Sequence, residues 1–182
     1  MKSLKIIVAL LAFLTFNCAS TVGVLSEFDA AVDFENYSSF VICIDDLYVE
    51  NTKFPEYDNN QVRDMIGSEI ESQMEARDHQ TNVLEPELQA GFTLLVEEKE
   101  AEFHNCDVQS EYEYWKECSI DTYVYTEETL VLYVSDIELN QVIWQASIQC
   151  DMNRSKTKLE PYVASLIEKL FNEYPKVPNS SL

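Results

Sequence analysis

The chain has very few glycines, which build phosphate-binding loops, and very few histidines, which act as bases in many active sites. Among its 182 residues only three are glycine (Gly23, Gly67 and Gly91) and two are histidine. Phosphate-binding loops need closely spaced glycines, because the backbone must approach the ligand without a side chain in the way. The sequence also lacks any Gly-x-Ser-x-Gly, Cys-x-x-Cys or Cys/His grouping with metal-site spacing. We therefore expect no cofactor, no metal and no catalytic residue.

Positive charge is also scarce. Twelve lysines and arginines stand against 33 acidic residues, which gives a formal net charge of −21 and an isoelectric point near 4.2. Such a chain is repelled by nucleic acids and by anionic membrane surfaces, so we expect no nucleic-acid partner. The charge favours cations or a basic protein, or it simply keeps the surface solvated.

One long apolar run is present, at the start of the chain. Lys2 and Lys5 precede it, and residues 6–14 are uncharged and apolar. This run is too short for a helix that crosses about 30 Å of hydrocarbon, so residues 1–17 are interpreted as a signal peptide. Cleavage before Cys18 would make this cysteine the lipid-attachment residue, with residues 18–27 as a tether. The alternative is cleavage near Ser20, which would release a soluble exported protein.

The cysteines fit an oxidising compartment. If Cys18 carries lipid, four of the five remain, which is an even number. We expect a first disulfide between Cys106 and Cys118, because both lie in one polar insertion that closes a short loop. A second disulfide would join Cys43 and Cys150 if their strands are close. The alternative is that these two are free, buried thiols.

Alternating or β-branched side chains predict four strands. The clearest covers residues 142–150, where Trp144, Ala146 and Ile148 share one face and three polar residues share the other. The four predicted strands cover residues 38–44, 91–103, 123–134 and 142–150.

Two segments show helical periodicity. Residues 60–77 follow an Asp58-Asn-Asn cap, and the second helix is expected to open at Pro161 and to end before Pro175. Their apolar stripes are Val62, Met65, Ile66, Ile70 and Met74, and Val163, Leu166, Ile167, Leu170, Phe171 and Tyr174. The order β-α-β-β-β-α predicts an α+β two-layer sandwich, in which two helices cover one face of an antiparallel sheet of about four strands. This single domain would span residues 28–176, followed by a tail at 177–182.

Few residues are candidates for chemistry. Glu98, Glu100 and Glu102 would line one face of a strand, where they are either solvated or attract cations. His79 and His104 could act as bases, but neither has a recognisable nucleophile motif. The polar, aromatic insertion at 105–120 could form a contact surface or pack over one end of the sheet.

Five stretches carry a resemblance to a known family. They are the opening Phe28-Asp-Ala-Ala-Val-Asp-Phe-Glu-Asn-Tyr37, the helix from Asn60, Pro86-Glu-Leu-Gln-Ala, the hairpin from Thr126 through Asp136 and Asn140 to Val142-Ile-Trp144, and the closing Tyr174-Pro175. With these stretches the chain resembles a family of bacterial envelope lipoproteins, DUF4136. None of these is a catalytic signature. The resemblance implies the fold and a place in the cell envelope, facing the periplasm or the exterior.

Together these observations predict an exported, non-enzymatic lipoprotein. It would be held to a membrane by its N-terminal lipid and would have a structural role or bind a protein partner, in an unspecified oligomeric state. One alternative is a protein that binds small ligands or cations at its acidic surface. Another is a hydrolase with paired carboxylates, which would need two carboxyl groups about 5–9 Å apart in a cleft.

Overall fold

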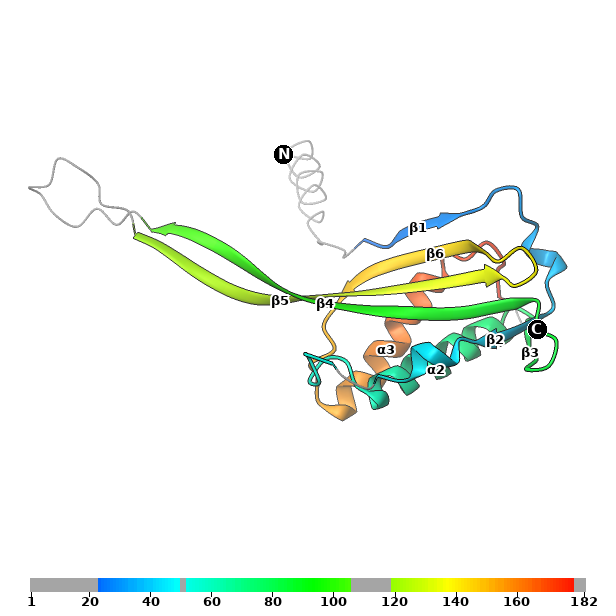
Figure 1. Ribbon diagram of the computed structural model, residues 1–182, viewed down its shortest axis with the longest axis horizontal. Helices are drawn as coiled ribbons and strands as arrows, with labels where there is room; N and C mark the ends of the chain where they lie inside the picture. The colour runs from blue at the N-terminus through cyan, green and yellow to red at the C-terminus, as the bar shows by residue number, and fades with distance from the viewer. Residues whose placement is uncertain (1–22, 50–51, 106–118, 179–182) are drawn as a thin grey trace, which may run out of the picture.

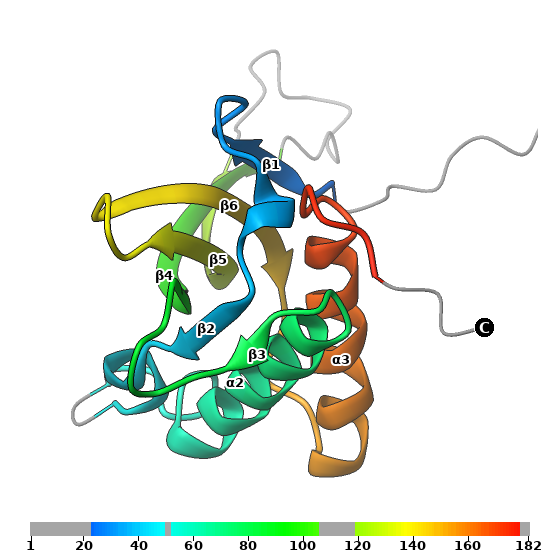
Figure 2. The ribbon, with the colours of Figure 1, turned by 90° about the vertical axis from the view of Figure 1, so that its right-hand side faces the viewer.

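The structure is a computed structural model that describes residues 23–49, 52–105 and 119–178. Helices α2 (Asn60–Glu75) and α3 (Lys156–Phe171) form one layer, and six strands form the other. Both helices lie against the same face of the sheet (Figures 1 and 2). The predicted α+β class with two helices is confirmed.

The sheet has the strand order β1-β6-β5-β4-β2-β3. Its strands are β1 (Leu25–Phe28), β2 (Ser39–Ile42), β3 (Gln80–Thr81), β4 (Leu88–Asn105), β5 (Ser119–Asp136) and β6 (Gln141–Cys150). Strand β2 pairs in parallel with both β3 and β4, while the remaining pairs are antiparallel.

The prediction of about four strands, all antiparallel, is therefore wrong. The strands β1 and β3 are only four and two residues long, too short to show a period of two. The parallel pairs form because α2 carries the chain from the end of β2 back to the start of β3 and β4, as parallel pairing requires.

Helix α2 matches its predicted stripe. The side chain of Asn59 accepts a hydrogen bond from the Val62 amide at 3.1 Å, which caps the first turn. The face toward the sheet is buried at Val62, Ile66, Gly67, Ile70 and Met74. At Gly67 a side chain would meet Leu47 of the neighbouring 3-10 helix, so the glycine permits close contact.

Helix α3 starts earlier than predicted. It begins at Lys156, so Pro161 lies inside the helix rather than in its first turn. The extra turn is held because Leu159 is buried in the core. The rest of the apolar stripe faces the sheet as expected, at Val163, Leu166, Ile167, Leu170 and Phe171.

The core is centred on Trp144 of β6. Its ring lies 5.3 Å from that of Phe171 and 5.1 Å from that of Tyr174, measured between centroids. Trp144, Ala146 and Ile148 are each at most 2% exposed, which confirms the predicted inward face of β6. Burial of this aromatic cluster ties the C-terminal segment to the sheet.

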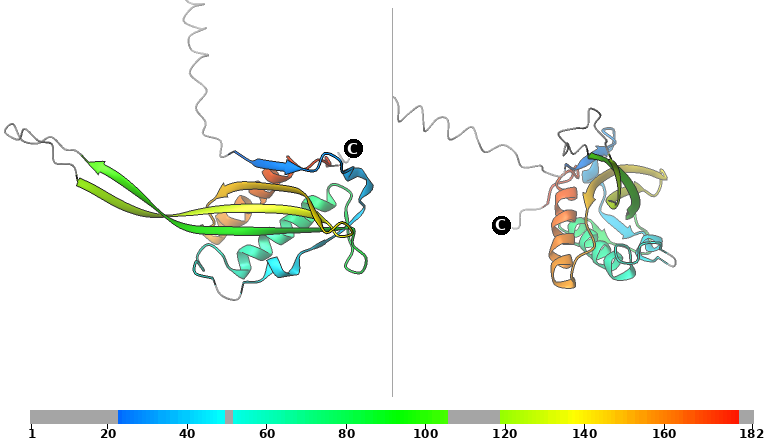
Figure 3. Two further views of the ribbon diagram at one scale, coloured as in Figure 1. Left: turned by 45° about the horizontal axis from the view of Figure 1, so that its top comes forward. Right: turned by 90° about the vertical axis from the view of Figure 1, so that its left-hand side faces the viewer.

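Strands β4 and β5 continue far beyond the rest of the sheet. Strand β2 pairs with β4 only at Leu88–Ala90, and β6 pairs with β5 only from Glu128 onward. Residues 97–105 and 119–127 therefore form a two-stranded ribbon, here called the stem, which projects from the body (Figures 1 and 3). At about 3.4 Å per residue, nine residue pairs extend about 30 Å.

Candidate functional site

Three of the predicted site residues lie outside the described residues. They are the proposed lipid-attachment residue Cys18 and the proposed disulfide partners Cys106 and Cys118. Most of the insertion at 105–120 lies there as well.

The predicted disulfide between Cys43 and Cys150 is contradicted, because both thiols are free. The Cys43 amide donates to Ala90, which aligns with Val134 and then with Trp144 across the sheet. Cys150 is therefore about 20 Å away along the strands and about 14 Å across them. A disulfide needs Cα atoms within about 7 Å, so the pair cannot form in this fold.

Cys150 does not lie in an activating environment. Burial raises the pKa of Cys150 to about 12, and the nearby Glu128 carboxylate adds to this effect. Such a thiol stays protonated at neutral pH and is a poor nucleophile.

The two histidines are far apart. His79 is 1% exposed, and its Nε2 lies 3.3 Å from the Tyr174 hydroxyl oxygen. Burial, followed by the nearby Lys176, lowers the pKa of His79 to about 4. His104 lies on the stem opposite Ile120. The structure thus places His79 among core residues and brings neither histidine to a shared site.

The hollows found on the described surface open to solvent. One of about 370 Å³ lies between β2, β3 and α2, where Ile42, Ile44 and Leu47 form much of its lining. It contains no histidine, and its two carboxylates, Asp64 and Glu71, both come from α2. Among residues 23–49, 52–105 and 119–178, no three His, Cys, Asp or Glu side chains are grouped closely enough to hold a metal ion.

The stem is the most unusual surface of the described structure, because one face is acidic. Glu98, Glu100 and Glu102 lie on this face, as predicted, opposite Thr126, Val124 and Thr122 of β5. All three glutamates are exposed. Strand geometry spaces them about 7 Å apart, which is within the Debye length, so their charges reinforce one another.

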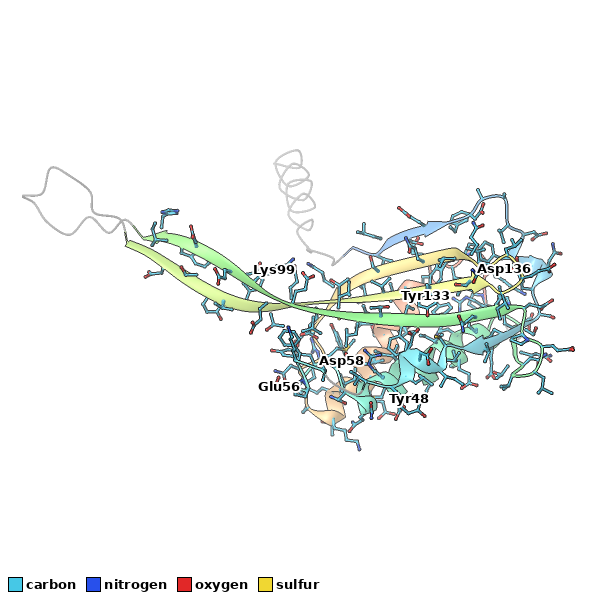
Figure 4. The ribbon with its side chains drawn as sticks, in the orientation of Figure 1. Tyr48, Glu56, Asp58, Lys99, Tyr133 and Asp136 are labelled. Atoms are coloured by element: carbon cyan, nitrogen blue, oxygen red, sulfur yellow. The ribbon has the colours of Figure 1, made fainter. Side chains whose placement is uncertain are left out.

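The other face of the stem is aromatic. Tyr125 lies opposite Lys99, and Tyr123 lies opposite Ala101. Tyr123 is 63% exposed and Phe103 is 60% exposed. Lys99 (Figure 4) forms ion pairs on this face with Glu127 and, at 3.8 Å, with Glu97.

Asp46 covers the backbone edge of β4 at Phe92, on the side of the strand that faces β2. One carboxylate oxygen accepts hydrogen bonds from the Phe92 amide at 2.9 Å and from the Tyr133 hydroxyl at 2.7 Å. Burial, followed by this hydrogen bond, raises the pKa of Tyr133. Asp46 belongs to the 3-10 helix that follows β2, so this contact covers the backbone edge of β4 at Phe92, five residues before the stem begins.

A two-stranded ribbon is marginal in water unless something packs on it. The stem nevertheless exposes aromatic and aliphatic side chains on both faces, including Val124 and Ile120 beside the glutamates. This combination is typical of a surface that docks a partner.

The sequence predicted the acidic face formed by Glu98, Glu100 and Glu102, but it did not predict that this face belongs to a projecting stem. Period two placed the three glutamates on one face, and that prediction is confirmed. The projection depends on how short β2 and β6 are relative to β4 and β5, which no local pattern states. A usable signal was that residues 100–104 alternate between polar and apolar side chains, which indicates that β4 continues toward the insertion.

A mixed six-stranded sheet covered by two helices, with one hairpin running past it, defines an α+β domain. The chain belongs to the family described as "Domain of unknown function (DUF4136)", whose model matches residues 24–176. The resemblance drawn from the sequence is thus confirmed. No curated protein matches this chain.

Two solved structures share the fold. A DUF4136 family protein from Bacteroides thetaiotaomicron has a TM-score of 0.53 at 14% identity, with coverage of 88% of this chain and 100% of that one. A PDZ domain protein from Parabacteroides distasonis has a TM-score of 0.52 at 10% identity, with coverage of 85% of this chain and 35% of that one. This chain thus spans about a third of the latter protein. At such identities the likeness concerns the fold alone.

Proposed function

We propose that this protein is exported to the bacterial cell envelope, is anchored there by lipid on Cys18, and acts without catalysis by binding another protein through its stem. The observation that carries the proposal is the exposed aromatic face of a ribbon that no other part of the described chain covers.

Energetics supports a binding role for the stem. Aromatic side chains dominate interface energies, and tyrosine is enriched at interfaces because its ring is apolar and its hydroxyl is polar. Tyr123 and Tyr125 provide such groups, and Phe103 adds a fully apolar one. Their burial by a partner would stabilise both the complex and the ribbon itself.

The non-enzymatic part of the proposal rests on the surroundings of the candidate bases. His79 is enclosed by core residues such as Tyr174 and lies at the end of the body away from the stem, where β3 lies in Figure 1. Glu128 is buried, but its carboxylate accepts the Met152 amide at 2.6 Å, which is a structural contact.

Site-specific photo-crosslinking in intact cells tests the proposal. A benzophenone amino acid at Tyr123 or Phe103 is expected to give an adduct with another protein. The same probe at Glu168, which is exposed on α3, is the matched control and is expected to give none. If both stem positions give no protein adduct while the protein is present at normal levels, the binding role is wrong.

A further inference from the structure

The two edges of the stem present different chemistry. Beyond Ala90, strand β4 pairs with no further strand on the β2 side within the described residues, and Asp46 bonds to its Phe92 amide there. The opposite edge is formed by β5, which loses its neighbour β6 beyond Glu128. Each edge is a row of backbone groups that could pair with another strand.

Backbone direction can be followed along β4. The Phe92 amide and the Ala90 carbonyl both point outward, to Asp46 and Cys43. The groups alternate along a strand, and no register shift interrupts the pairing with β5, so Glu98, Glu100 and Glu102 also point their N–H and C=O outward. In the stem the outward backbone positions of β4 are thus those of Glu98, Glu100 and Glu102, followed by His104.

A strand added at this edge would continue both faces of the ribbon. On one face its side chains would lie beside the three glutamates. On the other they would lie beside Lys99, Ala101 and Phe103. Lys99 already forms ion pairs with Glu97 and Glu127 on the other face. Among the described residues, no lysine or arginine forms an ion pair with the three glutamates of the acidic face.

We infer that an extended segment of a basic protein partner binds the β4 edge of the stem as a third strand. Its lysines or arginines occupy alternate positions beside Glu98, Glu100 and Glu102, and apolar residues between them extend the aromatic face. This inference rests on the proposed function and names the partner's chemistry. Main-chain hydrogen bonds supply affinity in such strand addition, and the alternating side chains supply specificity.

Charge argues against a second copy as the occupant. The stem carries six acidic residues, Glu97, Glu98, Glu100, Glu102, Asp121 and Glu127, and one lysine, Lys99. A second copy would bring an equally acidic stem, on a chain with a net charge of −21. Like charges placed together across an interface oppose association, whereas a basic segment gains in both affinity and association rate.

Peptide binding to the full chain tests the inference. The probe is a peptide of about ten residues with alternating lysine and valine, compared with a peptide of the same composition whose lysines are contiguous. The alternating peptide is expected to bind at least about tenfold more tightly, because only it matches the strand spacing of the glutamates. Amide exchange is expected to slow at Glu98, Glu100 and Glu102, but not at Thr122, Val124 and Thr126 of the β5 edge.

Two variants separate charge from strand pairing. The triple variant Glu98→Gln, Glu100→Gln, Glu102→Gln is expected to weaken binding about tenfold, since three surface ion pairs are lost. The matched control, Glu160→Gln, Glu168→Gln, Glu173→Gln, changes the net charge equally at exposed sites near α3 and is expected to change affinity less than about twofold. Glu100→Pro removes an outward N–H that bonds to nothing in the ribbon, so the stem is retained while pairing is blocked.

Equal binding of the two peptides, equal weakening by the two triple variants, or protection on the β5 edge would overturn the inference. So would a concentration-dependent dimer that the stem variants abolish, because a second copy would then occupy the surface. If Tyr123 crosslinks in cells to segments without lysine or arginine, the partner's chemistry is wrong but the binding role stands. If it crosslinks to nothing, the binding role itself fails.

Discussion

His79 shows how burial alone can link a single residue to the pH dependence of stability. Its ring packs edge-on against Tyr174, with centroids 5.9 Å apart, and Arg77 and Lys176 both disfavour a further positive charge. The pKa of His79 falls from 6.5 to about 4, chiefly through burial. The histidine is therefore neutral in the folded protein at any pH above about 4.

This shift predicts a loss of stability in mild acid. The unfolded chain takes up the proton as pH falls through 6.5, while the folded chain does not until about pH 4. Folding is thus destabilised by about 3 kcal/mol between these limits on account of His79, and its contribution is fully retained above pH 6.5. Urea unfolding at pH 7 and pH 4.5 checks this, because His79→Gln should lose less stability on acidification than the wild type. Equal losses in the two proteins would contradict it.

At the scale of helices and strands, Pro161 conflicts with its local structure. It lies in the sixth position of α3. Because proline has no backbone N–H, it cannot donate the helical hydrogen bond to the carbonyl of Thr157. The helix forms there anyway because Leu159 and Val163 on either side are buried against the core. Tertiary packing overrides the proline signal that made the predicted helix start too late.

Replacement of this proline should therefore stabilise the protein. Pro161 is exposed, so Pro161→Ala removes no core contact and restores the missing backbone hydrogen bond. We expect a gain of about 1–3 kcal/mol in the free energy of unfolding, measured by chemical denaturation. Pro175→Ala, outside the helix and exposed, is the control and should change stability by less than about 0.5 kcal/mol. A loss of stability in Pro161→Ala would show that the turn before it is not helical.

The same scale explains what could be predicted from sequence. Long periodic segments such as α2 and β6 gave the correct element, the correct buried face and bounds within a few residues. The strand β3 could not be found, because two residues show no periodicity and exist as a strand only beside β2. The acidic face, like the inward face of β6, could be predicted because its residues recur with a period of two. Its position beyond the body could not, because it depends on how short β2 and β6 are.

At the scale of the whole molecule, the start of β1 and the base of the stem lie at the same end of the sheet. Strand β1 begins at Leu25, which pairs with Ser147 near the end of β6. Strand β6 ends at Cys150, which lies opposite Glu128 at the base of the stem. Six residues separate Cys18 from Leu25, and the seven steps between them reach at most about 25 Å. The proposed lipid would therefore keep the base of the stem within reach of the membrane surface. None of the helices in the described part of the chain is long and apolar enough to cross a membrane.

We expect the proposed lipid alone to hold the protein to the membrane. A net charge of −21 gives the domain no attraction to anionic headgroups, and repulsion would push the stem away from them. Cys18→Ser should therefore move the protein completely from the membrane fraction to the soluble fraction, while Cys43→Ser, which alters a free thiol of the domain, should leave it attached. Intact mass of the membrane-bound wild type is expected to match a chain that starts at Cys18 and carries several acyl groups, since one chain gives only reversible binding. A chain without acyl groups that starts near Thr21 would refute the anchor, and the stem would then meet its partner away from the membrane.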